Sequence, residues 1–250
     1  MSGAAKNLIY PILGAAAFIL LWLIAAAAIG AEIILPAPDR AAVALFELLK
    51  SGAFWVDLAG TLDRSLKSFF LSFLLALALA AASALSRPLR RFLSPWIVIL
   101  RSVPTISVIL ISLLWLKSSL APIFIAFLIT FPNMYSAIYG AIEGVDPGLV
   151  EMSRLYKVRR RDMVTRLYIP SILPAVFTSA RSNISLNLKI IIASEVLAQT
   201  RESVGMAMQL SKIYLDTPML MAWTAAAIVL AALLELAVEG VKRAVIRWKA

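Results

Sequence analysis

Long apolar runs are the feature that most constrains how this chain can fold. The stretch from Asn7 to Gly30, NLIYPILGAAAFILLWLIAAAAIG, contains no charged residue, and a helix needs about 20 mostly apolar residues to cross a bilayer. Because lipid offers the backbone no hydrogen bonds, only helices and closed barrels can cross it. With 62% hydrophobic residues and a mean hydropathy of +0.90, the chain is predicted to be an all-α integral membrane protein.

Six such runs divide the chain, which predicts about six transmembrane helices in a single domain over residues 1–250. The runs cover residues 7–30, 61–86, 93–116, 120–142, 172–196 and 219–241, so the core spans lie within about 61–241. A cleaved signal peptide is the alternative for the first run, but that run is longer than a usual signal core. Pro104 interrupts the third run, where a fixed kink is expected. Asp39 is expected to cap a short helix that ends near Leu49.

Basic residues are unevenly distributed among the loops. If the N-terminus lies inside, the outer loops hold only Arg40, Lys50, Lys117, Arg201 and Lys212. The inner segments then hold 14 of the 24 Lys and Arg residues: Lys6, Arg87, Arg90, Arg91, Arg154, Lys157, Arg159, Arg160, Arg161, Arg166, Lys242, Arg243, Arg247 and Lys249. Because cytoplasmic loops collect Lys and Arg, both termini and the loop at 145–170 are predicted to be cytoplasmic. The same rule accounts for the net charge of +10, so no nucleic-acid partner is expected.

The residue types that are missing exclude several classes of chemistry. The chain has no Cys and no His, which removes disulfides, Cys/His metal sites and the commonest general base. No G-x-x-x-x-G-K-[ST] phosphate loop occurs, so any nucleotide that drives the protein must bind another chain. No carboxylate pair lies within the apolar runs. A membrane enzyme is therefore disfavoured, and no metal or cofactor is expected on this chain.

The most basic loop, Val145 to Pro170, is predicted to form two short amphipathic helices joined by a basic elbow. Asp146 and Pro147 suit the N-cap and first position of a helix. Its apolar residues Leu149, Met152 and Tyr156 share one face, and Met163, Val164 and Leu167 would form the apolar face of the second helix. Pro170 is expected to close that second helix. From composition alone, the loop could equally dock on a protein or lie on anionic lipid.

This loop resembles the "EAA" loop of ABC-transporter permeases, E-A-A, three residues, Gly, nine residues, I-x-L-P. Glu151-Met152-Ser153 takes the first place and Leu167 to Pro170 the last, at the matching spacing, while Lys157 stands where the family has Gly. Further segments resemble the nitrate/sulfonate/taurine/bicarbonate branch of this family. They are LPAP (Leu35–Pro38), TL…R (Thr61–Arg64), RSVP (Arg101–Pro104), VDPGLVE (Val145–Glu151), SEVL (Ser194–Leu197), SVGMAM (Ser203–Met208) and IRW (Ile246–Trp248).

The resemblance implies a type I ABC importer permease in the bacterial inner membrane. It would form a homodimer, bound to cytoplasmic ABC ATPases that hold ATP and fed by an extracytoplasmic solute-binding protein. The loop would then be the coupling helix that docks on the ATPase. Its ATPase-coupling residues would be Glu151, Met152, Ser153, Leu155, Tyr156, Lys157 and Pro170. A Lys in place of the motif Gly would strain the elbow or change its shape.

Polar residues gather in the fifth run, TSARSNISLNLKIIIASEVL. Asn183 and Asn187 are four apart, as are Ser185 and Lys189, which places each pair on one helix face. Ionisable residues inside a membrane suggest a pathway, so these four are candidate substrate-path residues, with Lys189 countering an anionic substrate. The alternatives are hydrogen bonds between helices and snorkelling of Arg181 to the inner interface.

Other charged residues in or near the runs are open to several interpretations. Arg101, just before the Pro104 kink, is a further substrate-path candidate. Glu195 could meet the binding protein, pair with Arg201 or lie at the surface, and Arg64 and Lys67 are expected at the outer interface. The alternative function is a secondary transporter or channel that uses Lys189 and Glu195 as coupling charges.

Overall fold

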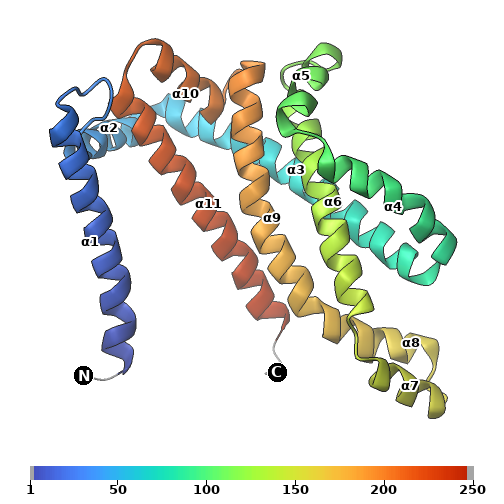
Figure 1. Ribbon diagram of the computed structural model, residues 1–250. Coiled ribbons are helices and arrows are strands. Elements are labelled where there is room, and N and C mark those ends of the chain that lie inside the picture. Colours follow the sequence, from blue (N-terminus) through green and yellow to red (C-terminus); the bar gives the residue numbers. More distant parts are fainter. Residues whose placement is uncertain (1–2, 247–250) are drawn as a thin grey trace.

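The computed structural model describes residues 3–246, and this part of the chain contains helices but no strand (Figure 1). In chain order the helices are α1 (Gly3–Ile29), α2 (Pro38–Lys50), α3 (Gly52–Leu85), α4 (Arg87–Ser102), α5 (Thr105–Trp115), α6 (Ala121–Glu143), α7 (Pro147–Leu155), α8 (Arg160–Met163), the π-helical turn η1 (Val164–Tyr168), α9 (Ile169–Ala198), α10 (Val204–Ile213) and α11 (Thr217–Val245). Arg247, Trp248 and Lys249, named above, lie outside the described residues, as does the side chain of Lys6.

Each of the six predicted spans is helical, but they are not equally suited to lipid. Within the described residues, α3, α6 and α11 are long and apolar enough to cross a membrane, and α4 with α5 forms a fourth candidate that is bent by 99°. The apolar part of α1, Ala16–Ile29, is shorter, and the long helix α9 carries Arg181, Lys189 and Glu195. The all-α membrane class is confirmed, whereas the count of six crossings is confirmed only in part.

The bend between α4 and α5 confirms the kink expected at Pro104. The first helix ends at Ser102 and the second begins at Thr105. Pro104 has no N–H to donate and disfavours helical geometry at the residue before it. The third span is therefore a pair of half-helices rather than one rod.

Near the N-terminal side of the core, the predicted cap of α2 is wrong and the second predicted span lies within a longer helix. Asp39 does not cap α2: the N-cap is Ala37 and Pro38 takes the first helical position, because its fixed φ suits that place. Asp39 lies in the first turn instead, where the helix dipole favours a carboxylate. Helix α3 begins at Gly52, so the span predicted from Thr61 continues a helix that starts two to three turns earlier.

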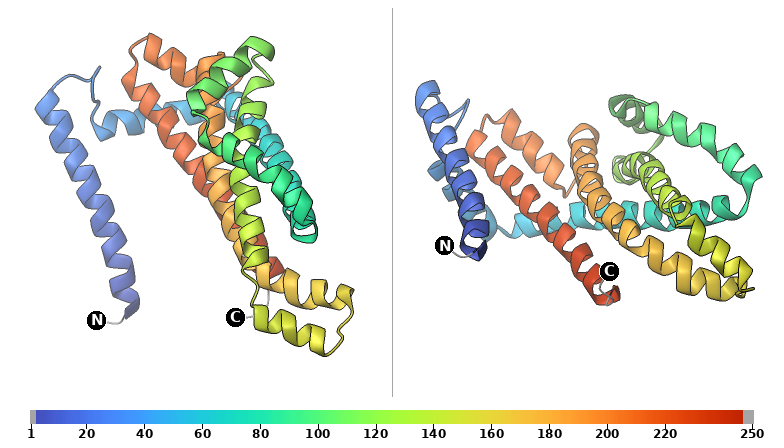
Figure 2. Two further views of the ribbon diagram at one scale, coloured as in Figure 1. Left: turned by 45° about the vertical axis from the view of Figure 1, so that its right-hand side comes forward. Right: turned by 60° about the horizontal axis from the view of Figure 1, so that its bottom comes forward.

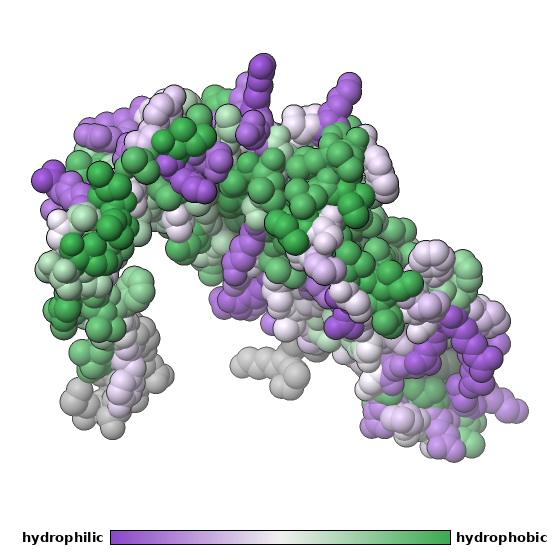
Figure 3. Space-filling model, turned by 45° about the horizontal axis from the view of Figure 1, so that its top comes forward, coloured by the Kyte–Doolittle hydropathy of each residue, from purple (hydrophilic) through white to green (hydrophobic). Residues whose placement is uncertain are grey.

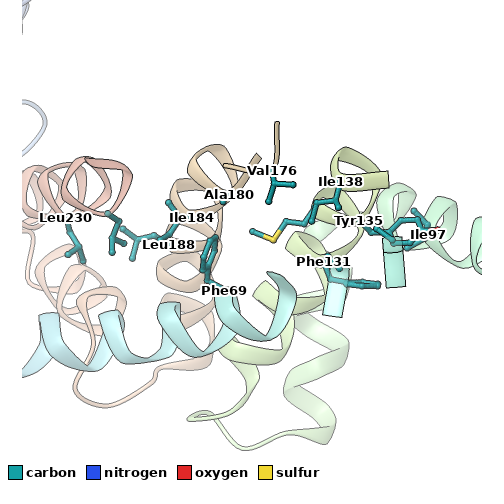
Figure 4. Close-up of a cluster of buried hydrophobic side chains, with 14 residues drawn as sticks. Phe69, Ile97, Phe131, Tyr135, Ile138, Val176, Ala180, Ile184, Leu188 and Leu230 are labelled. Atoms are coloured by element: carbon teal, nitrogen blue, oxygen red, sulfur yellow. The ribbon is translucent and has the colours of Figure 1, made fainter. Parts of the chain in front are cut away.

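The core lies where α3, α6 and α9 pack together, with α11 beside α9. Its main cluster includes Phe69, Phe131, Ile138, Ile184 and Leu188, all nearly inaccessible (Figure 4). Small residues allow the backbones to approach, since Ala76 and Ala80 of α3 are fully buried. A second cluster joins α2, α3, α10 and α11 around Phe54 and Trp223, whose ring centroids are 5.3 Å apart.

The ends of the molecule are arranged in a way that bears on its orientation. Both chain ends lie at the same end of the body as α7 and α8, and α5 and α10 lie at the opposite end, as Figures 1 and 2 show. In the space-filling view, hydrophilic residues gather over the α7–α8 region and apolar ones cover much of the body (Figure 3). Exposed side chains such as Leu74 (61%), Ile228 (65%) and Leu236 (62%) fit a surface that faces lipid.

Candidate functional site

The loop between α6 and α9 projects from the body as an arm, defined here as residues 146–168. Its first helix begins as predicted, because the Asp146 carboxylate accepts a hydrogen bond from the Gly148 N–H at 2.8 Å and Pro147 follows the cap. No residue of α7, α8 or η1 is buried. The arm therefore owes its shape to local hydrogen bonds rather than to packing on the body.

At the elbow of the arm, α7 is terminated by a residue in the left-handed backbone conformation, Lys157. The Val158 N–H donates to the Ser153 carbonyl at 2.9 Å, and the Lys157 N–H donates to the Arg154 carbonyl at 3.0 Å. This pair of bonds is the Schellman arrangement, which usually has Gly at the left-handed position. Lys157 has a φ of +52°, so the departure from the motif leaves the elbow's shape intact and places a strained residue in it.

Replacing Lys157 with Gly should make the arm more stable. A side chain in the left-handed region costs about 1–2 kcal/mol, partly offset by the greater freedom of Gly in the unfolded arm, which leaves a gain of roughly 0.5–1 kcal/mol. Amide hydrogen exchange at positions 147–163 should slow about two- to fivefold. The matched variant Lys157→Ala removes the charge and keeps Cβ, and equal exchange in the two variants would show that the backbone is not strained.

The prediction that Pro170 closes the second short helix is wrong. The chain continues from Arg160 through the π-turn into α9 without leaving helical geometry. The Ile169 N–H donates to the Val164 carbonyl, one residue further back than in an α-helix. The wider turn accommodates Pro170, which would otherwise interrupt the backbone hydrogen bonds of the helix. The second half of the arm and α9 therefore form one continuous helical element from Arg160 to Ala198.

The arm carries apolar side chains that neither the body nor the other half of the arm covers. Leu155 and Tyr156, beside the elbow, are 76% and 79% exposed, and Leu149 and Met152 are about half that. A hollow of about 550 Å³ separates the two halves and is lined by Ser153, Val158, Arg159, Asp162, Met163, Arg166 and Leu167. Met163 and Leu167 thus turn inward as an apolar pair, while Val164 remains exposed.

Asn187, a predicted path residue, lies fully buried between three helices. Its amide nitrogen donates to the Ser68 hydroxyl at 3.0 Å and lies 3.4 Å from the Thr130 hydroxyl, and its oxygen accepts from the Ser65 hydroxyl at 3.1 Å. These contacts favour the alternative in which Asn187 joins α9 to α3 and α6. Asn183 also stays within the protein, donating to the backbone carbonyl of Ser179 at 2.9 Å.

Lys189 is exposed on the face of α9 that approaches α11. Both Ser185 and Lys189 interact with Glu235 of α11. One turn from Ser185 toward the arm, Arg181 pairs with Glu235 at 3.3 Å and with Glu239 at 3.7 Å. No acidic residue lies four positions from Lys189 on α9, and the carboxylate that interacts with it belongs to α11. No described carboxylate comes within 4.0 Å of Lys189.

Arg101 lies apart from these residues, in a groove between α4 and α6. Its guanidinium is 3.5 Å from the Ser136 hydroxyl, and the groove has a volume of about 530 Å³. The predicted path candidates thus lie apart from one another: Lys189 beside α11, Asn187 between α3, α6 and α9, and Arg101 beside α6.

Glu195 and Arg64 form a buried ion pair that the sequence did not reveal. Glu195 has no exposed surface, and its carboxylate accepts from Arg64 Nε at 2.7 Å, from the Thr61 hydroxyl at 2.9 Å and from the Gly205 N–H at 3.2 Å. The interpretations of Glu195 as a surface charge or a partner of Arg201 are wrong. The pair holds α3, α9 and the start of α10 together at the end opposite the arm.

Gly205 is a local signal of this packing. A Cβ at that position would lie 2.4 Å from the Glu195 Cβ, so only Gly allows the α10 backbone to reach the carboxylate. The sequence separation of 131 residues between Arg64 and Glu195 hides the rest.

A helical membrane body with polar groups between its helices, and an arm that presents apolar side chains outside that body, fit a membrane transport subunit. The comparison with known families agrees. The model of the "Binding-protein-dependent transport system inner membrane component" family matches residues 72–249, well over half of the sequence. The chain belongs to this family.

Individual relatives point to the same branch as the motifs. The putative aliphatic sulfonates transport permease protein SsuC of Escherichia coli K12 is 28% identical over 216 residues, which cover 86% of this chain and 82% of that protein. The taurine transport system permease protein TauC of the same organism is 23% identical over 233 residues, covering 91% and 84%. The resemblance to the nitrate/sulfonate/taurine branch is confirmed.

The fold also matches that of a solved transporter. The crystal structure of a bacterial alginate ABC transporter, in complex with an alginate pentasaccharide-bound periplasmic protein, superposes with a TM-score of 0.62 at 16% identity. The match covers 99% of this chain and 98% of that one, and it shows the type I importer fold. The protein is a permease subunit of an ABC importer and not an enzyme.

Proposed function

We propose that two copies of this permease form a path for a small anionic or zwitterionic solute, and that a cytoplasmic ATPase drives the path through the arm. The solute class follows from the relatives named for sulfonates and taurine and from Lys189, the charged path candidate on α9. An extracytoplasmic binding protein would deliver the solute, as the family description implies. ATP would bind the ATPase, and this chain would carry no cofactor.

The observation that carries the proposal is the continuity of the arm with α9. A helix transmits displacement along its axis because each residue is tied to the next turn by backbone bonds. Movement of the arm by an ATPase would therefore move the helix that bears Asn187 and Lys189, without an intervening hinge. Leu155 and Tyr156 would anchor the arm in a groove of the ATPase, with Glu151 and Lys157 at the rim. Met152 and Ser153, on the same helix, would complete the contact.

The proposed orientation of the protein in the membrane has the arm and both termini facing the cytoplasm. All three lie at one end of the molecule (Figure 1), and the arm is rich in basic residues. Since the chain has no Cys, single cysteines can report on it. We expect Arg159→Cys to resist a membrane-impermeant thiol reagent in intact cells and to react once the membrane is permeabilised, and Lys212→Cys in the outer helix α10 to react in both. Labelling of position 159 in intact cells would contradict the topology.

Lys189 is proposed to face the path and to favour a negative group on the solute. A lysine at mid-membrane depth costs at least about 2.5 kcal/mol unless water or a partner attends it, and here it is exposed and interacts with Glu235 of α11. Lys189→Met should leave assembly intact and lower import severalfold, while Lys189→Arg should retain most of it. Lys67→Met, which removes an exposed outer lysine, is the matched control. Normal import by Lys189→Met would instead assign Lys189 to the contact between α9 and α11.

A further inference from the structure

The groove between α4 and α6 is lined by polar groups that the arm and the α9–α11 contact do not use. Helix α4 contributes Arg90, Ser94 and Arg101 at positions 90, 94 and 101, which fall on one helix face. Helix α6 contributes the Ser136 hydroxyl, and the volume between the helices is about 530 Å³. Two guanidinium groups and several hydroxyls therefore line a single space that is large enough for a small solute.

The two arginines are in different electrostatic states. Arg90 is neutralised, because Glu143 accepts from both of its terminal nitrogens at 2.6 and 3.3 Å, and Tyr139 donates its hydroxyl to the same carboxylate at 2.6 Å. Its guanidinium also lies over the Tyr139 ring, 4.8 Å from the centroid. Arg90 and Glu143 thus close the end of the groove nearest the arm with no net charge.

Arg101 has no such partner. In the described part of the chain, no carboxylate lies within 4.0 Å of it, and its contact is the Ser136 hydroxyl at 3.5 Å. The hydroxyl of Ser136 donates to the Pro132 carbonyl at 2.8 Å, which leaves its lone pairs toward the arginine. An unpaired arginine in a spanning region is costly and faces protein or water rather than lipid. The groove therefore presents one uncompensated positive charge to whatever fills it.

We propose that this groove is an anion-binding site of the permease, in which Arg101 takes the oxyanion head of a small sulfonate or carboxylate. The planar guanidinium offers paired N–H donors that match two oxygens of such a group. Hydroxyls of Ser94 and Ser102 can turn toward a third oxygen, and the neutral Arg90–Glu143 pair limits how far the anion moves toward the arm. The site rests on the proposed function, since it supplies a place along the path where the solute pauses.

The test uses a reporter cysteine inside the groove. Val98 lines the groove on the same helix as Arg101 and is 60% exposed, so Val98→Cys places a thiol there without removing a polar group. In the assembled importer, reconstituted in phosphatidylcholine vesicles, the thiol should react faster with the anionic sulfonatoethyl methanethiosulfonate than with its cationic trimethylammonium analogue. Adding Arg101→Gln should lower this ratio of rates at least about fivefold, because one nearby charge is lost.

Two comparisons separate a site from a general charge effect. Arg91→Gln removes an exposed charge next to Arg90 that does not line the groove, and it should leave the ratio unchanged. Millimolar ethanesulfonate should slow modification of position 98 when Arg101 is present, whereas choline should not. Ser94→Cys serves as a second reporter if the Val98 variant does not assemble.

The outcomes that overturn the site are specific. An unreactive thiol at both reporter positions would mean that the groove holds no water, and an unchanged ratio in Arg101→Gln would mean that Arg101 does not set its potential. Protection that appears only when phosphatidylglycerol is added to the vesicles, and not with ethanesulfonate, would assign the groove to a lipid headgroup. ATP-driven import is measured on the same vesicles, so failure of the site with intact import is distinct from failure of the proposed function.

Discussion

A permease with Leu155→Asp should insert and fold normally but lose its ATPase and its coupled import. Leu155 is 76% exposed at the elbow, and α7 has no buried residue, so the substitution removes little contact within this chain. A carboxylate forced into an apolar groove of a partner without a counter-charge costs several kcal/mol. We expect co-purification of the ATPase to fall by about 100-fold or more and import to fall to background.

Two further variants sharpen this prediction. Leu155→Met keeps an apolar side chain of similar volume and should retain most of the coupling. Glu151→Lys reverses a charge on the exposed helix α7 and should uncouple import or weaken assembly, since charges at the rim of an interface fix its orientation. If Leu155→Asp binds the ATPase and imports normally, the arm is not the contact. Loss of the permease from the membrane would show instead that the arm is needed for folding.

Removing Glu195 alone should produce the largest loss of stability. Glu195→Leu leaves the guanidinium of Arg64, 12% exposed, without its carboxylate, and breaking one side of a buried pair costs about 3–5 kcal/mol. The double variant Arg64→Met with Glu195→Leu removes both charges and should recover much of the loss, because the apolar pair needs no counter-ion. The measurement is the midpoint of thermal unfolding of the purified complex.

The control for this prediction is an exposed ion pair on α3, the helix that carries Arg64. Asp63 and Lys67 are 2.6 Å apart but 56% and 62% exposed, so Asp63→Asn should change stability by at most about 1 kcal/mol. If Glu195→Leu is as mild as Asp63→Asn, the buried network does not hold α10 to α3 and α9. If the double variant is no better than the single one, the loss comes from packing rather than from the orphaned charge.

Features encoded by neighbouring residues could be predicted from the sequence. Apolar runs of about 20 residues, long enough to cross a bilayer as a helix, predict the spanning helices. Asp146 and Pro147 predict the start of α7, and Pro104 predicts the bend between α4 and α5. The left-handed elbow at Lys157 could be anticipated too, because the motif has Gly there. All of these depend on backbone chemistry within a few residues.

Features that depend on which helices become neighbours could not be predicted. In the sequence Glu195 looks like a surface charge, because its partner Arg64 is 131 residues away on α3. The three hydroxyls that surround the Asn187 amide likewise come from α3 and α6 and are not foreseeable from its neighbours in the chain. Pro170 is expected to end a helix because proline usually does so, but the π-helical turn before it lets the helix continue. Each of these features depends either on residues far away in the sequence or on an uncommon turn.

Uptake into proteoliposomes tests most directly whether an ATPase drives this permease through the arm. The vesicles contain the permease and its ATPase, and the binding protein outside is loaded with the solute that it retains on purification. The account predicts uptake that requires ATP inside the vesicles, persists when a protonophore collapses the proton gradient, and stops with Leu155→Asp. Uptake by the permease alone that the protonophore abolishes would contradict the account and identify a secondary transporter.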